Sequence, residues 1–160
     1  MTHVQPNHLI TVRPAIPEEL RGLRELAYDL WWAWSPDAQD LFRRIDPDAW
    51  QSTHHNPVAL LGQVTPDQLA RRAEDAAFVH DLQRVVERRR RYLETRSWFS
   101  ARYSGAGDLT VAYFSMEYGI TESVPLYSGG LGVLAGDHQK AAPPQGVHRV
   151  AGSKVFRPGI

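Results

Sequence analysis

The sequence predicts a mainly α-helical N-terminal domain followed by the first strand, turn and helix of a doubly wound α/β domain. Through the first hundred residues, apolar side chains recur at helical spacing, and four prolines each follow a capping residue. After residue 108, a β-branched and aromatic run precedes a glycine-rich turn and a further apolar stretch. Doubly wound domains begin in this order.

Composition excludes several classes of protein. The 160 residues suffice for one domain, or for one domain and part of another, and are 42% hydrophobic and 22% charged, as in ordinary globular chains. The 18 basic and 18 acidic side chains cancel, so no global field attracts nucleic acid or an anionic membrane. With no cysteine, no secretory signal and no membrane-spanning run, we expect a cytoplasmic protein with neither a nucleic-acid nor a membrane partner.

We expect four segments along the chain. Residues 1–14 form a flexible N-terminus, and residues 15–103 form the helical domain. After a short link at Ser104–Asp108, residues 109–142 begin an incomplete α/β domain. Residues 143–160 are predicted to be an irregular tail, because no helical or strand period survives there and Pro143-Pro144 should break the preceding helix.

A long helix is expected after Pro17, where apolar residues recur at helical spacing as far as Trp34. It contains the aromatic cluster Tyr28–Trp34, which is either a stacking platform for sugar or base rings or a part of the core. The spacing favours burial of Trp31 and Trp34, with Trp32 packed beside them.

Four short helices are expected next, each beginning at a capping residue followed by proline. The pairs are Ser35-Pro36, Asp46-Pro47, Asn56-Pro57 and Thr65-Pro66. The first residue accepts hydrogen bonds from free backbone N–H groups, and proline lacks an N–H that this position does not need. Gln68, three residues after Thr65, completes a capping box.

A second long helix is predicted from about Ala73 to Phe99, and it contains Arg88–Arg91. Four consecutive helical residues surround the helix rather than sharing one face, so a nucleic-acid patch is disfavoured. We expect ion pairs of Glu87 with Arg91 and of Arg90 with Glu94 instead. His54-His55 could suggest a metal, but adjacent residues in a turn point apart, so no metal site is predicted.

The run Leu109–Met116 reads as a buried strand, and Gly129–Gly136 as a glycine turn that opens a helix. Glycines let backbone N–H groups approach a ligand, and the helix dipole favours a phosphate at its N-terminus. The spacing matches neither the dinucleotide fingerprint nor a Walker loop, so taken alone it leaves open an anion site or merely a tight strand-to-helix turn.

Several stretches together resemble the bacterial α-glucan (glycogen and maltodextrin) phosphorylases. Leu26–Gln39, Leu41–Asp46 and His55–Val58 are similar to the extra helical N-terminal domain of that branch. Val111–Gly119 and Tyr127–His138 are similar to the start of the catalytic region, and this second motif is specific. The resemblance covers roughly residues 13 to 142.

The resemblance implies a two-lobed, GT-B-like glycosyltransferase fold that phosphorolyses α-1,4-glucan to glucose 1-phosphate with pyridoxal phosphate. The partners it implies are therefore α-glucan and phosphate. Gly129, Gly130, Leu131 and Gly132 would present backbone N–H groups to phosphate and glucosyl groups. The family's Schiff-base lysine lies far toward the C-terminus in a motif that neither Lys140 nor Lys154 matches, so no catalytic or cofactor-binding residue is assigned.

The family chain is several times longer than 160 residues, and from about Ala141 the sequence leaves the family pattern. We therefore expect a truncated fragment that binds no cofactor and is inactive alone, with a frame shift in the gene as one explanation for its tail. A glycogen or starch synthase is an alternative, but its Gly-Gly-Leu-Gly turn usually follows a lysine, whereas Tyr127-Ser128 precede the turn here. A stand-alone helical interaction module is the alternative outside the enzymes.

Overall fold

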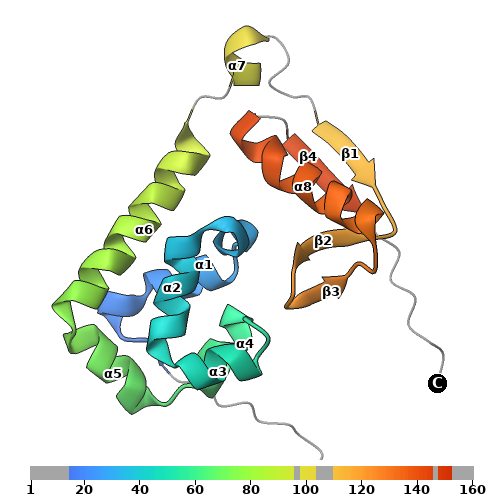
Figure 1. Ribbon diagram of the computed structural model, residues 1–160. Helices are drawn as coiled ribbons and strands as arrows, with labels where there is room; N and C mark the ends of the chain where they lie inside the picture. Colours follow the sequence, from blue (N-terminus) through green and yellow to red (C-terminus); the bar gives the residue numbers. More distant parts are fainter. Residues whose placement is uncertain (1–14, 96–97, 104–109, 146–147, 153–160) are drawn as a thin grey trace, which may run out of the picture.

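The computed structural model describes residues 15–95, 98–103, 110–145 and 148–152 (Figure 1). The predicted flexible N-terminus, the link at 104–108 and Lys154 lie outside these residues. The described part is mostly helical. The helices from η1 to α6 form one group. A smaller segment, made of strands and the helix α8, lies beside this group in Figure 1.

The single helix expected after Pro17 is wrong, because the chain there forms three short pieces. These are η1 (Glu18–Leu20), α1 (Gly22–Ala27) and η2 (Leu30–Trp34). Asp29 between the last two is extended, and its carboxylate accepts a 2.9 Å hydrogen bond from the backbone N–H of Trp31. This local cap competes with helix continuation and starts a new 3₁₀ turn.

All four predicted helix starts are confirmed. The helices are α2 (Pro36–Ile45), α3 (Pro47–Ser52), α4 (Pro57–Gln63) and α5 (Pro66–Glu74). Thr65 and Gln68 form the expected capping box, and the side chains of Asp46 and Asn56 accept backbone N–H groups. Ser35 differs, because its hydroxyl accepts a hydrogen bond from Arg88 on a distant helix instead.

The second long helix is shorter than predicted. It is α6 (Ala76–Glu94), and it begins where the Asp75 carboxylate accepts the backbone N–H groups of Ala77 and Phe78. A separate helix, α7 (Trp98–Arg102), follows. Of the predicted stripe, Leu82 and Val85 are buried and Leu93 is exposed. In the last turns of α6, Tyr92 still packs against the core, with its ring 6.2 Å from that of Trp31, whereas Leu93 points away from it.

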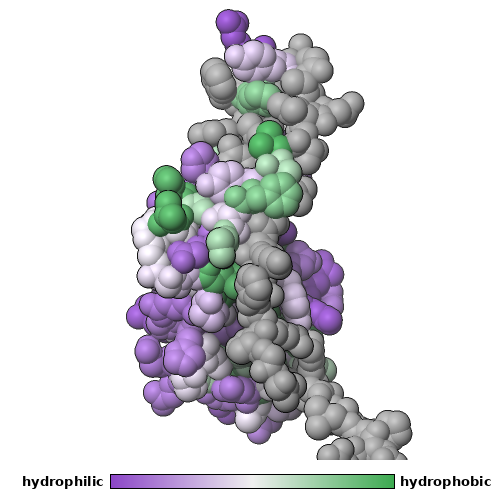
Figure 2. All heavy atoms as spheres, turned by 90° about the vertical axis from the view of Figure 1, so that its right-hand side faces the viewer, coloured by the Kyte–Doolittle hydropathy of each residue, from purple (hydrophilic) through white to green (hydrophobic). Residues whose placement is uncertain are grey.

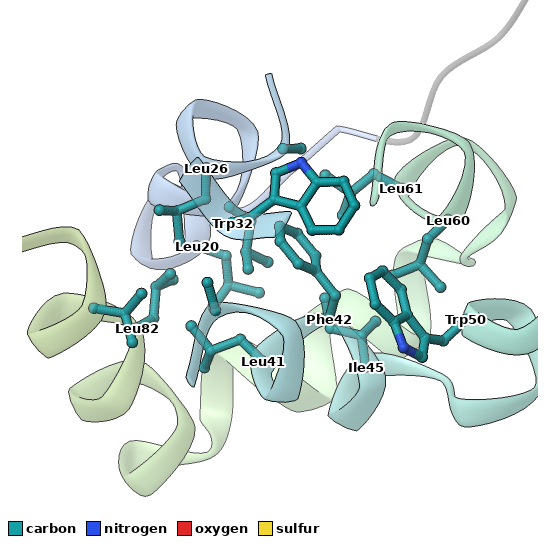
Figure 3. Packing of buried hydrophobic residues seen from close by; sticks show 14 of the residues in the cluster. Leu20, Leu26, Trp32, Leu41, Phe42, Ile45, Trp50, Leu60, Leu61 and Leu82 are labelled. Carbon is teal, nitrogen blue, oxygen red and sulfur yellow. The ribbon is translucent and has the colours of Figure 1, made fainter. Parts of the chain in front are cut away.

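The core of the helical part is continuous and lies among η1, α1, η2 and helices α2 to α6 (Figure 3). Phe42 stacks on Trp50 with ring centroids 5.9 Å apart, and Trp32 meets Trp50 edge-on at 6.1 Å. Burial of Trp31 is as predicted, whereas Trp34 is only partly buried and Leu30 is exposed. The prediction for Trp34 is wrong because the break at Asp29 changes which side chains of this segment face the core. The two buried tryptophans are therefore Trp31 and Trp32.

The smaller segment contains β1 (Thr110–Phe114), the antiparallel pair β2 (Tyr118–Thr121) and β3 (Val124–Leu126), α8 (Gly130–Gln145) and β4 (His148–Gly152). β4 pairs in parallel with β1, in register from Thr110–His148 to Phe114–Gly152. The prediction of an irregular tail is therefore wrong for residues 143–145 and 148–152. The helix α8 runs as far as Gln145, so Pro143-Pro144 lie within its last turn and do not end it before that point.

The β1 strand is not buried as predicted. Tyr113 is half-buried, whereas Phe114 is 80% exposed and Met116 just beyond the strand is also exposed. Leu131 and Leu134 on α8 are exposed as well. Figure 2 looks onto this side of the molecule, where hydrophobic residues gather in the upper half above a mainly hydrophilic lower half. The described residues thus leave these large apolar side chains of the strand segment exposed.

His55 joins the helical part to the hairpin of β2 and β3. Its ring lies 5.2 Å from that of Trp50, its Nε2 is 3.2 Å from Gln51, and its Nδ1 is 2.9 Å from the Glu122 carboxylate. His54 and His55 both have positive φ, a conformation that side chains other than glycine adopt at a cost. The described residues contain no group of three or more His, Cys, Asp or Glu placed to hold a metal ion.

The arginine run is divided among separate acidic partners. Arg88 contacts Asp37, Arg89 contacts Asp29, and both Arg90 and Arg91 contact Glu87. The predicted ion pair of Glu87 with Arg91 is confirmed, at 3.6 Å. The predicted pair of Arg90 with Glu94 is wrong, because Arg90 contacts Glu87 at 2.9 Å instead. None of the helices in the described ranges combines the length and apolarity needed to cross a bilayer.

Candidate functional site

The glycine turn lies where β3 ends and α8 begins. Gly129 precedes the helix, and its carbonyl oxygen accepts the backbone N–H groups of Gly132 at 3.1 Å and Val133 at 3.4 Å. The next two residues, Gly130 and Leu131, occupy the first turn, and their backbone N–H groups have no partner among the described residues. Such free N–H groups at the N-terminus of a helix attract an anion.

The glycines of this turn fall into two groups. A side chain at Gly132 would collide with Tyr127 and Glu117, and one at Gly136 would overlap the backbone of Gly119 on β2. These two glycines allow α8 to pack closely on the hairpin. A Cβ at Gly129 or Gly130, in contrast, would meet no atom within 4 Å. Packing of the described residues therefore does not require glycine at those two positions.

The Glu117 carboxylate lies against the start of the turn. It accepts a hydrogen bond of 2.8 Å from the hydroxyl of Ser128 and one of 3.3 Å from its backbone N–H. The Ser128 hydroxyl is the main reason that the pKa of Glu117 is lowered, and backbone N–H groups of Ser128, Gly129 and Gly132 add to the effect. Sequence reasoning assigned no role to Glu117. An acid shortly after a strand that leads to a glycine turn is the signal that could have revealed it.

We expect the glycine turn to loosen in acid. The lowered pKa means that the ionised carboxylate stabilises the folded turn at neutral pH, and this contribution is lost as the pH falls through the folded-state pKa. The amide nitrogen shifts of Ser128, Gly129 and Gly132 should titrate together, with an apparent pKa below the usual glutamate value. The same resonances in Glu117→Gln should not titrate in this range. A common titration that persists in Glu117→Gln would contradict the assignment.

Other side chains hold the strands and helix behind the turn together. The Tyr118 hydroxyl donates a 2.7 Å hydrogen bond to the carbonyl oxygen of Tyr113, and the Tyr113 ring stacks on His138 of α8 with centroids 5.6 Å apart. The Lys140 ammonium lies 3.5 Å from the carbonyl oxygen of Gly119 and 3.9 Å from the Asp137 carboxylate.

The structure thus brings together the four predicted binding residues, but with different surroundings. Gly129, Gly130 and Leu131 are exposed, whereas Gly132 is buried against the hairpin. The neighbouring Ser128 is already occupied by Glu117. The exposed part of the turn is therefore Gly129 to Leu131.

Comparison with known proteins supports the resemblance seen in the sequence. Residues 16–124 match the family described as Protein of unknown function (DUF3417). The chain is 42% identical over 154 residues to a protein named glycogen phosphorylase from Mycobacterium tuberculosis, covering 93% of this chain and 18% of that protein. A maltodextrin phosphorylase from Thermococcus litoralis is 39% identical over 149 residues, covering 92% of this chain and 18% of that protein.

A protein named glycogen phosphorylase from Aquifex aeolicus is 37% identical over 125 residues, which cover 78% of this chain and 17% of that protein. The chain thus spans somewhat less than a fifth of the length of these relatives. No solved structure matches it.

Proposed function

Because the chain belongs to the DUF3417 family and is similar to glycogen and maltodextrin phosphorylases, we propose that it forms the N-terminal part of an α-glucan phosphorylase. In this proposal, residues 15–103 are an accessory helical domain and β1 to β4 begin the α/β catalytic region of a GT-B-like fold. The parallel pairing of β1 with β4, with α8 between them in the chain, supports the second assignment.

The open space at Gly129 and Gly130 carries the site assignment. Glycine restricts a chain less than any other residue, so two consecutive glycines cost conformational entropy on folding. No described neighbour needs them to lack a side chain, and the adjacent N–H groups of Gly130 and Leu131 are free. A ligand that approaches the backbone explains both features. The phosphate and the glucosyl group of an α-glucan phosphorolysis are such ligands.

Glu117 has a supporting role in this site. By accepting hydrogen bonds at Ser128, its carboxylate fixes the entry to the turn and leaves Gly130 and Leu131 for the substrate. Its negative charge also keeps a second anion away from the earlier part of the turn. The complete protein would release glucose 1-phosphate from α-1,4-glucan and phosphate, with pyridoxal phosphate held by residues outside this chain. The chain by itself would be inactive.

A chimera tests this function. The segment of the M. tuberculosis glycogen phosphorylase that aligns with this chain is replaced by the chain, and glucose 1-phosphate released from glycogen and phosphate is measured. We expect phosphorolysis by the chimera and none by the isolated 160-residue chain.

The unmodified relative is the positive control, and circular dichroism and cofactor absorbance check that the chimera is folded and loaded. A folded, cofactor-loaded chimera without activity in either direction would show that the chain does not serve this function.

A further inference from the structure

A shallow hollow lies on the helical part, where α1 ends and η2 begins. It has a volume of about 490 Å³ and is lined by Glu25, Tyr28, Asp29, Leu30 and Arg89. Its volume lies within the roughly 300–1,000 Å³ typical of small-molecule sites. None of its residues belongs to the glycine turn. The break in the helix at Asp29 creates it, because the chain changes direction there and places Tyr28 and Leu30 at the surface.

One charged pair in this hollow is held rigidly. One carboxylate oxygen of Asp29 accepts the backbone N–H of Trp31, and the other accepts the Arg89 Nε–H at 2.6 Å. Both side chains are largely shielded from solvent. Arg89 is thereby fixed through Nε alone, and its two terminal nitrogens have no partner among the described residues. They remain as donors for a ligand.

The remaining lining residues provide an acceptor and an apolar wall. The Glu25 carboxylate makes no hydrogen bond or ion pair with any described residue. Tyr28 is 60% exposed and Leu30 is 42% exposed, although the residues around them are mostly buried in the core. A large exposed aromatic residue beside an exposed leucine in a concave site is typical of a binding surface.

We propose that this hollow binds a short segment of α-1,4-glucan, holding the polymer on the helical domain away from the glycine turn. A sugar hydroxyl can accept a hydrogen bond from Arg89 and donate one to Glu25 at the same time. The C–H face of a glucose ring can pack on the exposed Tyr28 ring and on Leu30. The choice of glucan among sugars rests on the proposed function.

Ligands that carry a charge fit less well. An anion would face the carboxylates of Glu25 and Asp29, and a cation would face the guanidinium of Arg89. The neutral, polyhydroxylated ring is the chemistry that uses the donor, the acceptor and the apolar wall together. The same reasoning excludes free phosphate and glucose 1-phosphate from this hollow.

Titration of the isolated ¹⁵N-labelled chain with maltoheptaose tests the proposal, with cellohexaose and inorganic phosphate as comparison ligands. Maltoheptaose should shift the backbone resonances of residues 25–30 and 89 in a saturable way at millimolar concentrations. Phosphate should not shift them, and cellohexaose should bind more weakly because its β-linkages hold the rings at a different angle. Absence of saturable shifts at these residues, or equal binding of cellohexaose, would overturn the assignment to α-1,4-glucan.

Tyr28→Ala and Glu25→Gln should each raise the dissociation constant, Tyr28→Ala by about tenfold or more because it removes the stacking surface. Tyr103→Ala, at another half-exposed tyrosine, is the matched control and should bind like the unmodified chain. Circular dichroism should be unchanged in all three, since these side chains are exposed. An unchanged dissociation constant in Tyr28→Ala would show that the sugar does not stack in this hollow.

The result of the maltoheptaose titration can be distinguished from the result of the chimera experiment. If the chimera phosphorolyses glycogen but the chain does not bind maltoheptaose at these residues, the hollow is not a glucan site and the proposed function stands. If maltoheptaose binds here but the folded chimera is inactive, the function is wrong and the hollow remains a sugar site.

Discussion

Gly130→Val in the active chimera should reduce phosphorolysis on the order of a hundredfold or more, as loss of a positioned backbone donor does in other enzymes. The space around Gly130 is open, so the valine fits within the described structure. It fills the position from which phosphate would reach the N–H groups of Gly130 and Leu131. Glucose 1-phosphate release at saturating phosphate, together with helical circular dichroism, is the measurement.

Gly62→Val is the matched control for this variant. Gly62 lies in α4, and a Cβ there also meets no atom within 4 Å. The substitution is chemically the same but lies on a helix of the helical part rather than in the turn, so activity should be retained. If Gly130→Val retained full activity, the turn would be only a connection between β3 and α8.

Trp32→Ala should destabilise the helical part by about 3–5 kcal/mol, the usual cost of truncating a buried aromatic residue. Trp32 is only 3% exposed and contacts Trp50 edge-on within the core (Figure 3). This loss is comparable with the whole stability of many domains of this size. Urea unfolding followed by circular dichroism gives the free energy of unfolding.

Leu30→Ala provides the comparison within the same short helix. Because its side chain is exposed, we expect a change of less than about 1 kcal/mol, compared with about 2–5 kcal/mol for truncation of a buried leucine. Equal losses in the two variants would mean that η2 packs in a different register.

Local signals in the sequence were sufficient to locate the starts of α2 to α5. Asp46, Asn56 and Thr65 satisfy backbone N–H groups within their own first turn, so nothing distant is needed to define these helices. The same logic explains why the break at Asp29 was missed. Asp29 has the same capping chemistry, but no proline follows it and the apolar period runs through it.

The hairpin could not be predicted because its strands are very short, and β4 could not be predicted because its partner strand is distant in the sequence. β2 and β3 are only 4 and 3 residues long, and β4 is defined by pairing with β1 almost forty residues earlier. In the site, the glycine pattern located the turn but could not show which glycines are packed against the hairpin and which are exposed. That distinction depends on where Tyr127 and Gly119 lie in space. The role of Glu117 likewise depends on a contact across the hairpin.

The arrangement of the core also determines the order in which this polypeptide can assemble. Every fully buried core residue of the helical part lies between Leu20 and Val85, so this core is complete once those residues have left the ribosome. The β1 strand emerges soon afterwards, but it must wait for β4, and its Phe114 side chain still remains exposed. The helical unit is therefore able to fold before the exposed, apolar end of β1 meets its partner strand.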